Sequence, residues 1–238
     1  PSLYNESLFM PIRVWAFYFA RKEKWLKASL LGAFASATRV IGILLLPVFL
    51  IEWFAQNRPI SKIKYKKYIP LVWVALVSLG LLAYMFYLRQ TTADALAFIN
   101  TLPGFGEQRS ATPILLPQVF YRYFVRILPN LNYSYFPVVF TTFLEISLAI
   151  LFFILSLLAF FKLRLSYAVY LLLGYLVPTL SGSFSSLPRY VLVLFPGFIL
   201  LTLLFSKSSR FFQITLLLLF LLLLGIATAL FARGFWVS

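Results

Sequence analysis

The chain alternates between long apolar runs and short polar connections. One run, Ile69–Leu88, would be about 30 Å long as a helix, which matches the hydrocarbon thickness of a bilayer. Another, Phe211–Ala232, has a leucine-rich centre and contains no charged residue. The apolar runs are Ser7–Ala20, Ala28–Ala37, Val40–Phe54, Ile69–Leu88, Phe136–Phe161, Leu165–Leu180, Tyr190–Phe205 and Phe211–Ala232. The pattern predicts an all-α, polytopic transmembrane helical bundle with about seven membrane segments.

Composition supports this prediction. Hydrophobic residues make up 62% of the 238 residues, and charged residues only 11%. A soluble domain has about 25% charged residues, so we expect lipid to cover much of this apolar surface. We treat residues 1–238 as a single transmembrane domain. The chain starts at Pro1 rather than Met, and we interpret it as a fragment that lacks an N-terminal part.

The charges are concentrated in the polar connections. The formal net charge is +15, and thirteen of the 21 Lys and Arg lie in four short segments: Arg21–Lys27, Arg58–Lys67, Lys162–Arg164 and Lys207–Arg210. Such clusters between apolar runs are typical of the cytoplasmic loops of membrane proteins. The distribution argues against a nucleic-acid-binding groove, and no nucleic-acid partner is expected.

The stretch Ala28–Phe54 is too long for one ordinary span and too short for two. The two basic segments that flank it are expected on the same side of the membrane. We therefore predict a short helical hairpin that turns near Ser36–Arg39. Ala28, Gly32 and Ser36 recur every four residues, a spacing that allows a neighbouring helix to approach closely.

This topology places three distant charged residues at one outer face. Glu6, Arg39 and Arg189 all come to that face, together with Arg89–Ser134, which we predict to be a long extracytoplasmic loop. Charged groups that converge at a membrane boundary are candidates for function. We expect the three side chains to border a common cavity, with groups within about 10–15 Å of each other.

Residue types limit the available chemistry. The chain has no Cys and no His. Cysteine nucleophiles, histidine bases and the usual zinc sites are therefore excluded, and we expect neither a metal nor a cofactor. Acid–base chemistry must use Tyr, Lys or one of six acidic residues: Glu6, Glu23, Glu52, Asp94, Glu107 and Glu145.

Three short motifs carry a resemblance. They are Tyr-x-Glu-Ser-x-Phe at Tyr4–Phe9, Ala-Thr-Arg ending at Arg39 and followed by Gly42 and an aliphatic run to Pro47, and Pro-Arg-Tyr at Pro188–Tyr190. In their order and spacing the sequence resembles the PIG-V-like GPI mannosyltransferases and their bacterial relatives. That family belongs to the GT-C superfamily of polytopic membrane glycosyltransferases.

The resemblance implies a function. It implies transfer of a sugar, with mannose as the expectation, from a polyprenyl-phosphate donor lipid to a hydroxyl of a glycan or glycolipid acceptor. The reaction would take place at the non-cytoplasmic face, in the plasma membrane of a bacterium or the endoplasmic reticulum membrane of a eukaryote. The family's catalytic acid lies in its first outer loop, which would precede Pro1.

The candidate site follows from both lines of reasoning. Glu6 is the candidate catalytic acid–base or sugar-hydroxyl ligand. Arg39 and Arg189 are candidate ligands of the donor phosphate, because guanidinium groups pair well with phosphate oxygens. Tyr4 and Tyr190 would stack on a sugar or lie at the membrane interface.

Simpler roles exist for these residues and for several others. Glu6 would serve as a helix cap, and the two arginines would extend to water. Glu145 would be either a site residue or a structural partner inside its span. Arg122 and Arg126 are spaced for one helix face and would grip lipid phosphate or be solvated. Arg13 lies where the family is apolar, and the sequence assigns it no function.

Two other function classes remain open. A secondary transporter or lipid flippase would also contain a broken hairpin and buried charges. We find no inverted repeat of the kind that many transporters contain. A structural membrane subunit without chemistry is the third reading.

Overall fold

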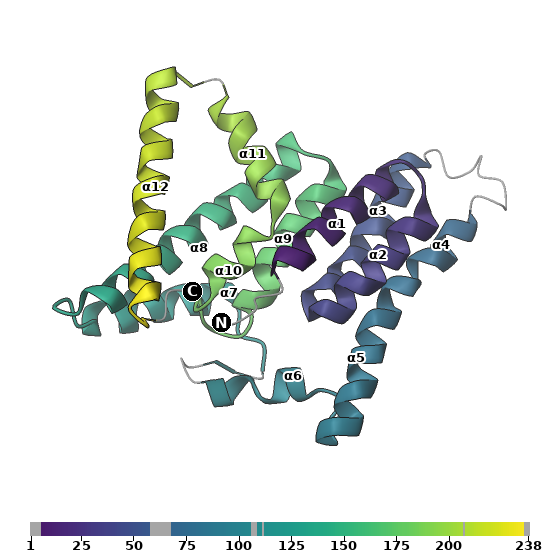
Figure 1. The fold of residues 1–238 in the computed structure, drawn as a ribbon, viewed down its shortest axis with the longest axis horizontal. Coiled ribbons are helices and arrows are strands. Elements are labelled where there is room, and N and C mark those ends of the chain that lie inside the picture. The colour runs from purple at the N-terminus through teal and green to yellow at the C-terminus, as the bar shows by residue number, and fades with distance from the viewer. Residues whose placement is uncertain (1–5, 58–67, 106–108, 111, 207, 236–238) are drawn as a thin grey trace.

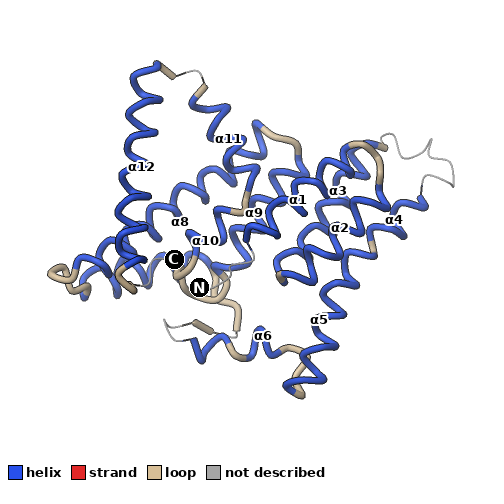
Figure 2. The backbone as a smooth tube through the Cα atoms, viewed as in Figure 1, coloured by secondary structure: helices blue, strands red, loops and turns tan. Residues whose placement is uncertain are grey.

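The computed structural model describes residues 6–57, 68–105, 109–110, 112–206 and 208–235. Within these ranges the chain is helical and contains no β-strand, which confirms the predicted all-α class (Figure 2). The α-helices are α1 (Glu6–Arg21), α2 (Trp25–Thr38), α3 (Leu45–Gln56), α4 (Ile69–Val74), α5 (Leu76–Thr92), α6 (Ala97–Asn100), α7 (Leu116–Tyr121), α8 (Phe136–Lys162), α9 (Leu165–Thr179), α10 (Leu187–Leu192), α11 (Phe195–Phe205) and α12 (Arg210–Ala232). Shorter 3₁₀ and π turns are η1 (Val40–Leu44), η4 (Leu102–Phe105), η5 (Arg122–Ile127) and η6 (Leu128–Asn130).

The helices form two packed groups. Helices α1 to α5 pack together on the right of Figure 1, and α8 packs against α9, α10 and α11 in the centre. Helix α3 joins the groups by contacting α9. Helix α12 stands on the left side, beyond α11 (Figure 1).

The chain turns back at the predicted position. Helix α2 ends at Thr38, and Arg39 is extended, with φ −148° and ψ 134°. The chain then reverses through η1 into α3. Gly42 makes the tight turn possible, because a Cβ atom there would lie 2.4 Å from the backbone of Ala35.

The small-residue face of α2 packs closely against α5, as its spacing predicted. Ser36 Oγ donates a hydrogen bond to the Val77 carbonyl over 2.6 Å. Helix α5 contributes its own small residue, because a Cβ on Gly80 would lie 1.9 Å from the Ala33 carbonyl oxygen. The sequence pattern on α2 alone gave no indication of Gly80.

Two predicted elements differ from the structure. The run Tyr190–Phe205 is not one helix, because α10 ends at Leu192 and α11 starts at Phe195. Pro196 causes this break, since proline has no N–H to donate to the carbonyl four residues earlier and its ring clashes with that carbonyl. The segment Arg89–Ser134 is more ordered than a loop and includes α6, α7 and the short turns between them.

Three helical stretches are long and apolar enough to cross a membrane: Ile69–Thr92, Phe136–Lys162 and Arg210–Ala232. Helix α12 leaves most of its leucines uncovered by protein, including Leu217 and Leu221, which are 61% and 62% exposed. Soluble monomers rarely expose continuous apolar surfaces of this kind.

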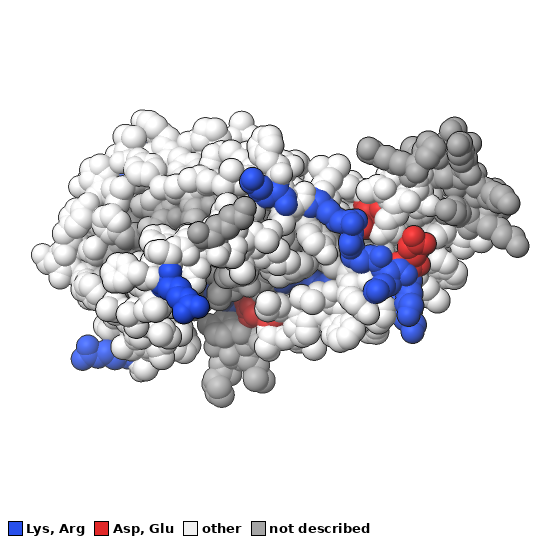
Figure 3. Space-filling model, turned by 90° about the horizontal axis from the view of Figure 1, so that it is seen from above, with Lys and Arg blue, Asp and Glu red and all other residues white. Residues whose placement is uncertain are grey.

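Charged residues mark the two ends of the bundle. Arg21 and Arg164 both reach Glu52, at 3.4 and 3.6 Å, so the basic segments that contain them share one end. Figure 3 shows the largest group of Lys and Arg to the right of centre, beside acidic residues, with separate basic residues farther left. Residues 58–67 and 207 lie outside the described residues. Glu6, at the opposite end of α1 from Arg21, is about 22 Å away along the helix axis.

Candidate functional site

Glu6, Arg39 and Arg189 meet at one point. Arg39 Nη1 donates a hydrogen bond to Glu6 Oε1 over 2.8 Å, and Arg189 Nη2 donates to the same oxygen over 3.1 Å. The side chains of Arg39, Glu6 and Arg189 are 15%, 18% and 27% exposed, so the cluster is half-buried. The three side chains therefore lie within the predicted distance of each other, although none of them lines the cavity described below. We call them the outer trio, after the face that the sequence predicts for them.

Each member of the outer trio lies at or near the end of a helix. Glu6 is the first residue of α1, where the helix dipole favours a carboxylate. Arg39 is the extended residue between α2 and η1. Arg189 lies in the short helix α10, which follows Ser186 in a left-handed conformation, with φ 64°. Helix ends thus bring side chains from three sequence regions together.

Aromatic rings flank the trio. The Arg39 guanidinium lies over the ring of Tyr190 at 5.2 Å and near the ring of Phe9 at 5.7 Å. These distances are typical of cation–π contacts. Tyr190 therefore orients Arg39, whichever ligand the site binds. Tyr4 lies outside the described residues.

The electrostatics of Glu6 follow from this geometry. Glu6 precedes the first apolar run. Burial alone would raise the pKa of its carboxyl group. A backbone hydrogen bond, Arg189 and Arg39 outweigh that effect, and the net pKa lies below its usual value of 4.5. Glu6 is therefore ionised at neutral pH, and the outer trio carries a net charge of +1.

A cavity of about 300 Å³ opens beside the trio. Val40, which follows Arg39, and Tyr190, which follows Arg189, both line it. Phe98 and Ile99 of α6 and the end of α9 close the other sides. The lining is mainly apolar, with Arg109 as its charged residue, so the cavity suits a ligand with an apolar or sugar-like part next to an anionic group.

Arg109 and Arg122 brace the loop before Arg189. Arg109 donates to the carbonyl and hydroxyl of Ser185 over 3.3 and 3.2 Å, and Arg122 donates to the Gly182 carbonyl over 2.7 Å. These contacts give Arg122 a structural role, whereas Arg126 is exposed. Sequence reasoning missed this brace, because the contacts join residues more than 50 positions apart and follow no local pattern.

Glu145 has structural partners. It is buried on α8 and accepts a hydrogen bond from the Tyr123 hydroxyl over 3.0 Å. The Tyr123 oxygen also accepts from the backbone N–H of Phe184 over 3.0 Å. The structure therefore favours the structural reading of Glu145 over a role in the outer trio.

A second carboxylate lies at the opposite end of the bundle. Glu52 is buried and pairs with Arg21 and Arg164. It also accepts hydrogen bonds from Ser166 Oγ over 2.6 Å and Gln56 Nε2 over 2.7 Å. This inner cluster joins α1, α3 and α9, and the sequence analysis did not assign it.

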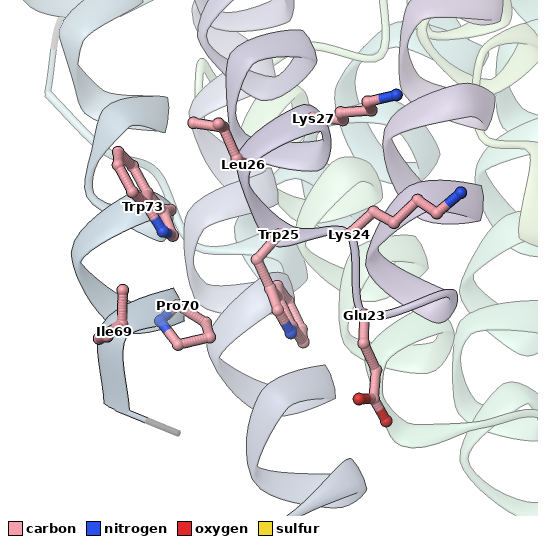
Figure 4. Close-up of a pocket in the computed structure, with 8 residues that line it drawn as sticks. All are labelled: Glu23, Lys24, Trp25, Leu26, Lys27, Ile69, Pro70 and Trp73. Atoms are coloured by element: carbon pink, nitrogen blue, oxygen red, sulfur yellow. The ribbon is translucent and has the colours of Figure 1, made fainter. Parts of the chain in front are cut away.

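A groove of about 430 Å³ lies at this same basic end, between α2 and α4. Figure 4 shows Trp25, Pro70 and Trp73 facing one another, while Lys24 and Lys27 extend away from Trp73. Its polar groups do not converge, so we place the candidate site at the outer trio instead. Among the described residues, no cluster of acidic side chains could hold a metal ion.

Comparisons with known proteins found no relative of this chain. No protein-family model, no curated protein and no solved structure matches the chain. The assignment of a function therefore rests on the residues and the geometry described above.

Proposed function

We propose that this chain is a multi-pass membrane glycosyltransferase of the GT-C type. In this proposal it moves a sugar, with mannose as the first candidate, from a polyprenyl-phosphate donor to an acceptor hydroxyl at the end of the bundle where Glu6 lies. The observation that carries the proposal is the pairing of Arg39 and Arg189 with a single oxygen of Glu6. Two convergent guanidinium groups on a net-positive, half-buried site suit a phosphate.

The membrane part of the proposal rests on exposed apolar surface. About seven membrane segments, one of them the short hairpin of α2 and α3, would place the outer trio at one boundary and the inner cluster at the other. The helices α4–α5, α8 and α12 have the length that this requires. Basic side chains near Glu52 would then face the cytoplasm.

The chemistry follows from charge. The acceptor oxygen forms a bond to the anomeric carbon of the sugar, while the bond from that carbon to the phosphate oxygen breaks and the electron pair leaves with the polyprenyl phosphate. Arg39 and Arg189 would stabilise the charge that grows on this leaving group. As the arginines engage the phosphate, Glu6 loses part of its ion pairing. Its pKa then rises, so it becomes a better base for the acceptor proton.

A transfer assay tests the proposal. Membranes that contain the full chain would be given polyprenyl-phosphate mannose and a glycolipid acceptor. Arg39→Gln and Arg189→Gln should each lower turnover by about 10²–10³-fold, the usual cost of removing one transition-state donor. Arg126→Gln removes an exposed arginine from the same end of the bundle and should leave turnover unchanged. Normal transfer in both trio variants would refute the phosphate assignment.

A secondary transporter or lipid flippase is the second candidate. Each end of the bundle contains one carboxylate that binds two arginines, Glu6 at one end and Glu52 at the other, and this symmetry favours a transporter. Alternating access requires closures on both sides of a substrate site. Movement of a labelled polyprenyl phosphate between leaflets, without any sugar transfer, would favour this function over the enzyme.

A further inference from the structure

Arg13 is a fully buried cation in the middle of α1. Its side chain has 0% exposure, and its guanidinium lies 4.0 Å from the ring centre of Phe9. Nε donates to the Phe9 carbonyl over 3.2 Å, Nη1 donates to the Tyr170 hydroxyl, and Nη2 donates to the Val193 carbonyl. One side chain thereby joins α1, α9 and the end of α10.

The Val193 carbonyl is available because the chain breaks there. In a continuous helix it would accept from Gly197, four residues later. Gly197 instead donates to the Leu194 carbonyl over 2.9 Å, since Pro196 interrupts the helix. A buried carbonyl without a partner is costly, and Arg13 supplies the donor. The departure from the predicted single helix and the buried arginine are therefore parts of one arrangement.

Helices α1 and α10 are bridged at two levels. The outer bridge is the Glu6–Arg189 ion pair, at 3.1 Å. The inner bridge is the bond from Arg13 to the Val193 carbonyl. Arg13 lies two turns after Glu6 on α1, and Val193 lies about one turn after Arg189, at the end of α10. Both bridges therefore start from the same face of α1 and end on the same face of α10. Two bridges fix both the distance and the tilt between helices, whereas the outer bridge alone leaves the tilt free.

We infer that Arg13 is a positioning residue, which holds α10 against α1 so that Arg189 and Glu6 reach the same point. Its three donors, in the fixed fork of a guanidinium, bind three separate acceptors at once, and the single ammonium of a lysine on its flexible stem does not reproduce that geometry. The effect on sugar transfer rests on the proposed function, but the effect on helix geometry does not.

The geometry is tested by distance measurement between spin labels. The chain has no cysteine, so labels at Met10 on α1 and Leu192 on α10, which are 39% and 59% exposed, give a clean pair. Arg13→Met keeps the volume and removes the donors. It should broaden and shift the Met10–Leu192 distance distribution, while Arg13→Lys should give an intermediate result.

A control pair distinguishes this effect from general unfolding. Labels at Leu26 on α2 and Leu82 on α5, both exposed, report a helix contact that Arg13 does not touch. That distribution should stay the same in all variants. An unchanged Met10–Leu192 distribution in Arg13→Met, or equal changes in both pairs, would overturn the inference. If Arg13→Met does not fold, Tyr170→Phe removes only one of the three acceptors and should shift the first pair in the same direction by less.

A double-variant comparison tests the functional consequence. A displacement of about 1 Å at a reacting group costs on the order of 10²-fold in rate, so Arg13→Met should lower turnover by up to that factor. If Arg13 acts through Arg189, Arg13→Met should cause no further loss in the Arg189→Gln background. Full additivity of the two losses would refute positioning. A lack of transfer in the unmodified chain would instead refute the proposed enzyme, and the spin-label distances would still decide the role of Arg13.

Discussion

Arg39 donates a hydrogen bond to Glu6 over 2.8 Å, although 33 residues separate the two in the sequence. The contact closes the gap between the first residue of α1 and the hairpin turn after α2. With Arg189 on the same oxygen, it gathers three charged groups at one end of the bundle.

Tyr190 should act on the site through its ring. The ring lies 5.2 Å from the Arg39 guanidinium, and such a contact contributes about 0.5–2 kcal/mol. Tyr190→Phe retains the ring and should keep transfer near the unmodified level. Tyr190→Leu should lower it by up to about tenfold. Equal losses in the two variants would show that the hydroxyl group, rather than the ring, is needed.

The ion pairs of Glu6 should make stability depend on pH in the acid range. Because the folded-state pKa of Glu6 lies below its usual value of 4.5, ionised Glu6 stabilises the fold fully above that value. The stabilisation is lost as the pH falls through the lowered pKa. Thermal unfolding in detergent should show a difference between the unmodified chain and Glu6→Gln that is constant near neutral pH and shrinks below about pH 4.5. A difference that grows on acidification would contradict the ion-pair geometry.

Gly80 should be required for the packing of α2 on α5. A Cβ atom there would lie 1.9 Å from the Ala33 carbonyl oxygen, so Gly80→Ala should reduce the free energy of unfolding by about 1–3 kcal/mol. Gly225 on α12 is the matched control, because a Cβ there meets nothing within 4 Å. Gly225→Ala should be neutral or stabilise by up to about 1 kcal/mol. Equal effects of the two substitutions on unfolding would refute the close packing.

The membrane topology should place the two charged clusters on opposite sides. Single cysteines are unambiguous in this chain, which has none of its own. A cysteine at Lys24, beside the inner cluster, should react with an impermeant reagent from one side of sealed vesicles. A cysteine at Asn130 should react from the other. Labelling of both positions from the same side would rule out the proposed arrangement of spans.

The apolar runs predicted the long helices well, because burial in lipid or protein requires long apolar segments. The hairpin at Arg39 followed from the charges on either side of it. The break between α10 and α11 could have been predicted from Pro196 but was hidden by the continuous apolar run around it. The partners of Arg13 could not be predicted, because the Val193 carbonyl becomes available only when that break and the packing of α1 are both known.

The outer trio could be predicted as a group, but its pairing could not. The sequence and the family resemblance predicted that Glu6, Arg39 and Arg189 lie at one face. That both arginines bind the same carboxylate oxygen depends on how the three helix ends are rotated, which the sequence does not show. The brace formed by Arg109 and Arg122 on the loop before Arg189 depends equally on tertiary contacts. The local sequence around Arg109 and Arg122 indicates only a connecting segment with polar and aromatic residues, and it does not show which residues these arginines contact.

In the proposed function, Arg39 and Arg189 bind the phosphate of a lipid-linked sugar. The most direct test is binding of polyprenyl-phosphate mannose to the purified chain in lipid nanodiscs, measured by native mass spectrometry against the uncharged polyprenol. We predict saturable binding of the phosphate lipid, weak binding of the polyprenol, and at least about tenfold weaker phosphate-lipid binding in the Arg39→Gln, Arg189→Gln double variant. Equal binding of the phosphate lipid by the double variant and the unmodified chain would contradict the claim.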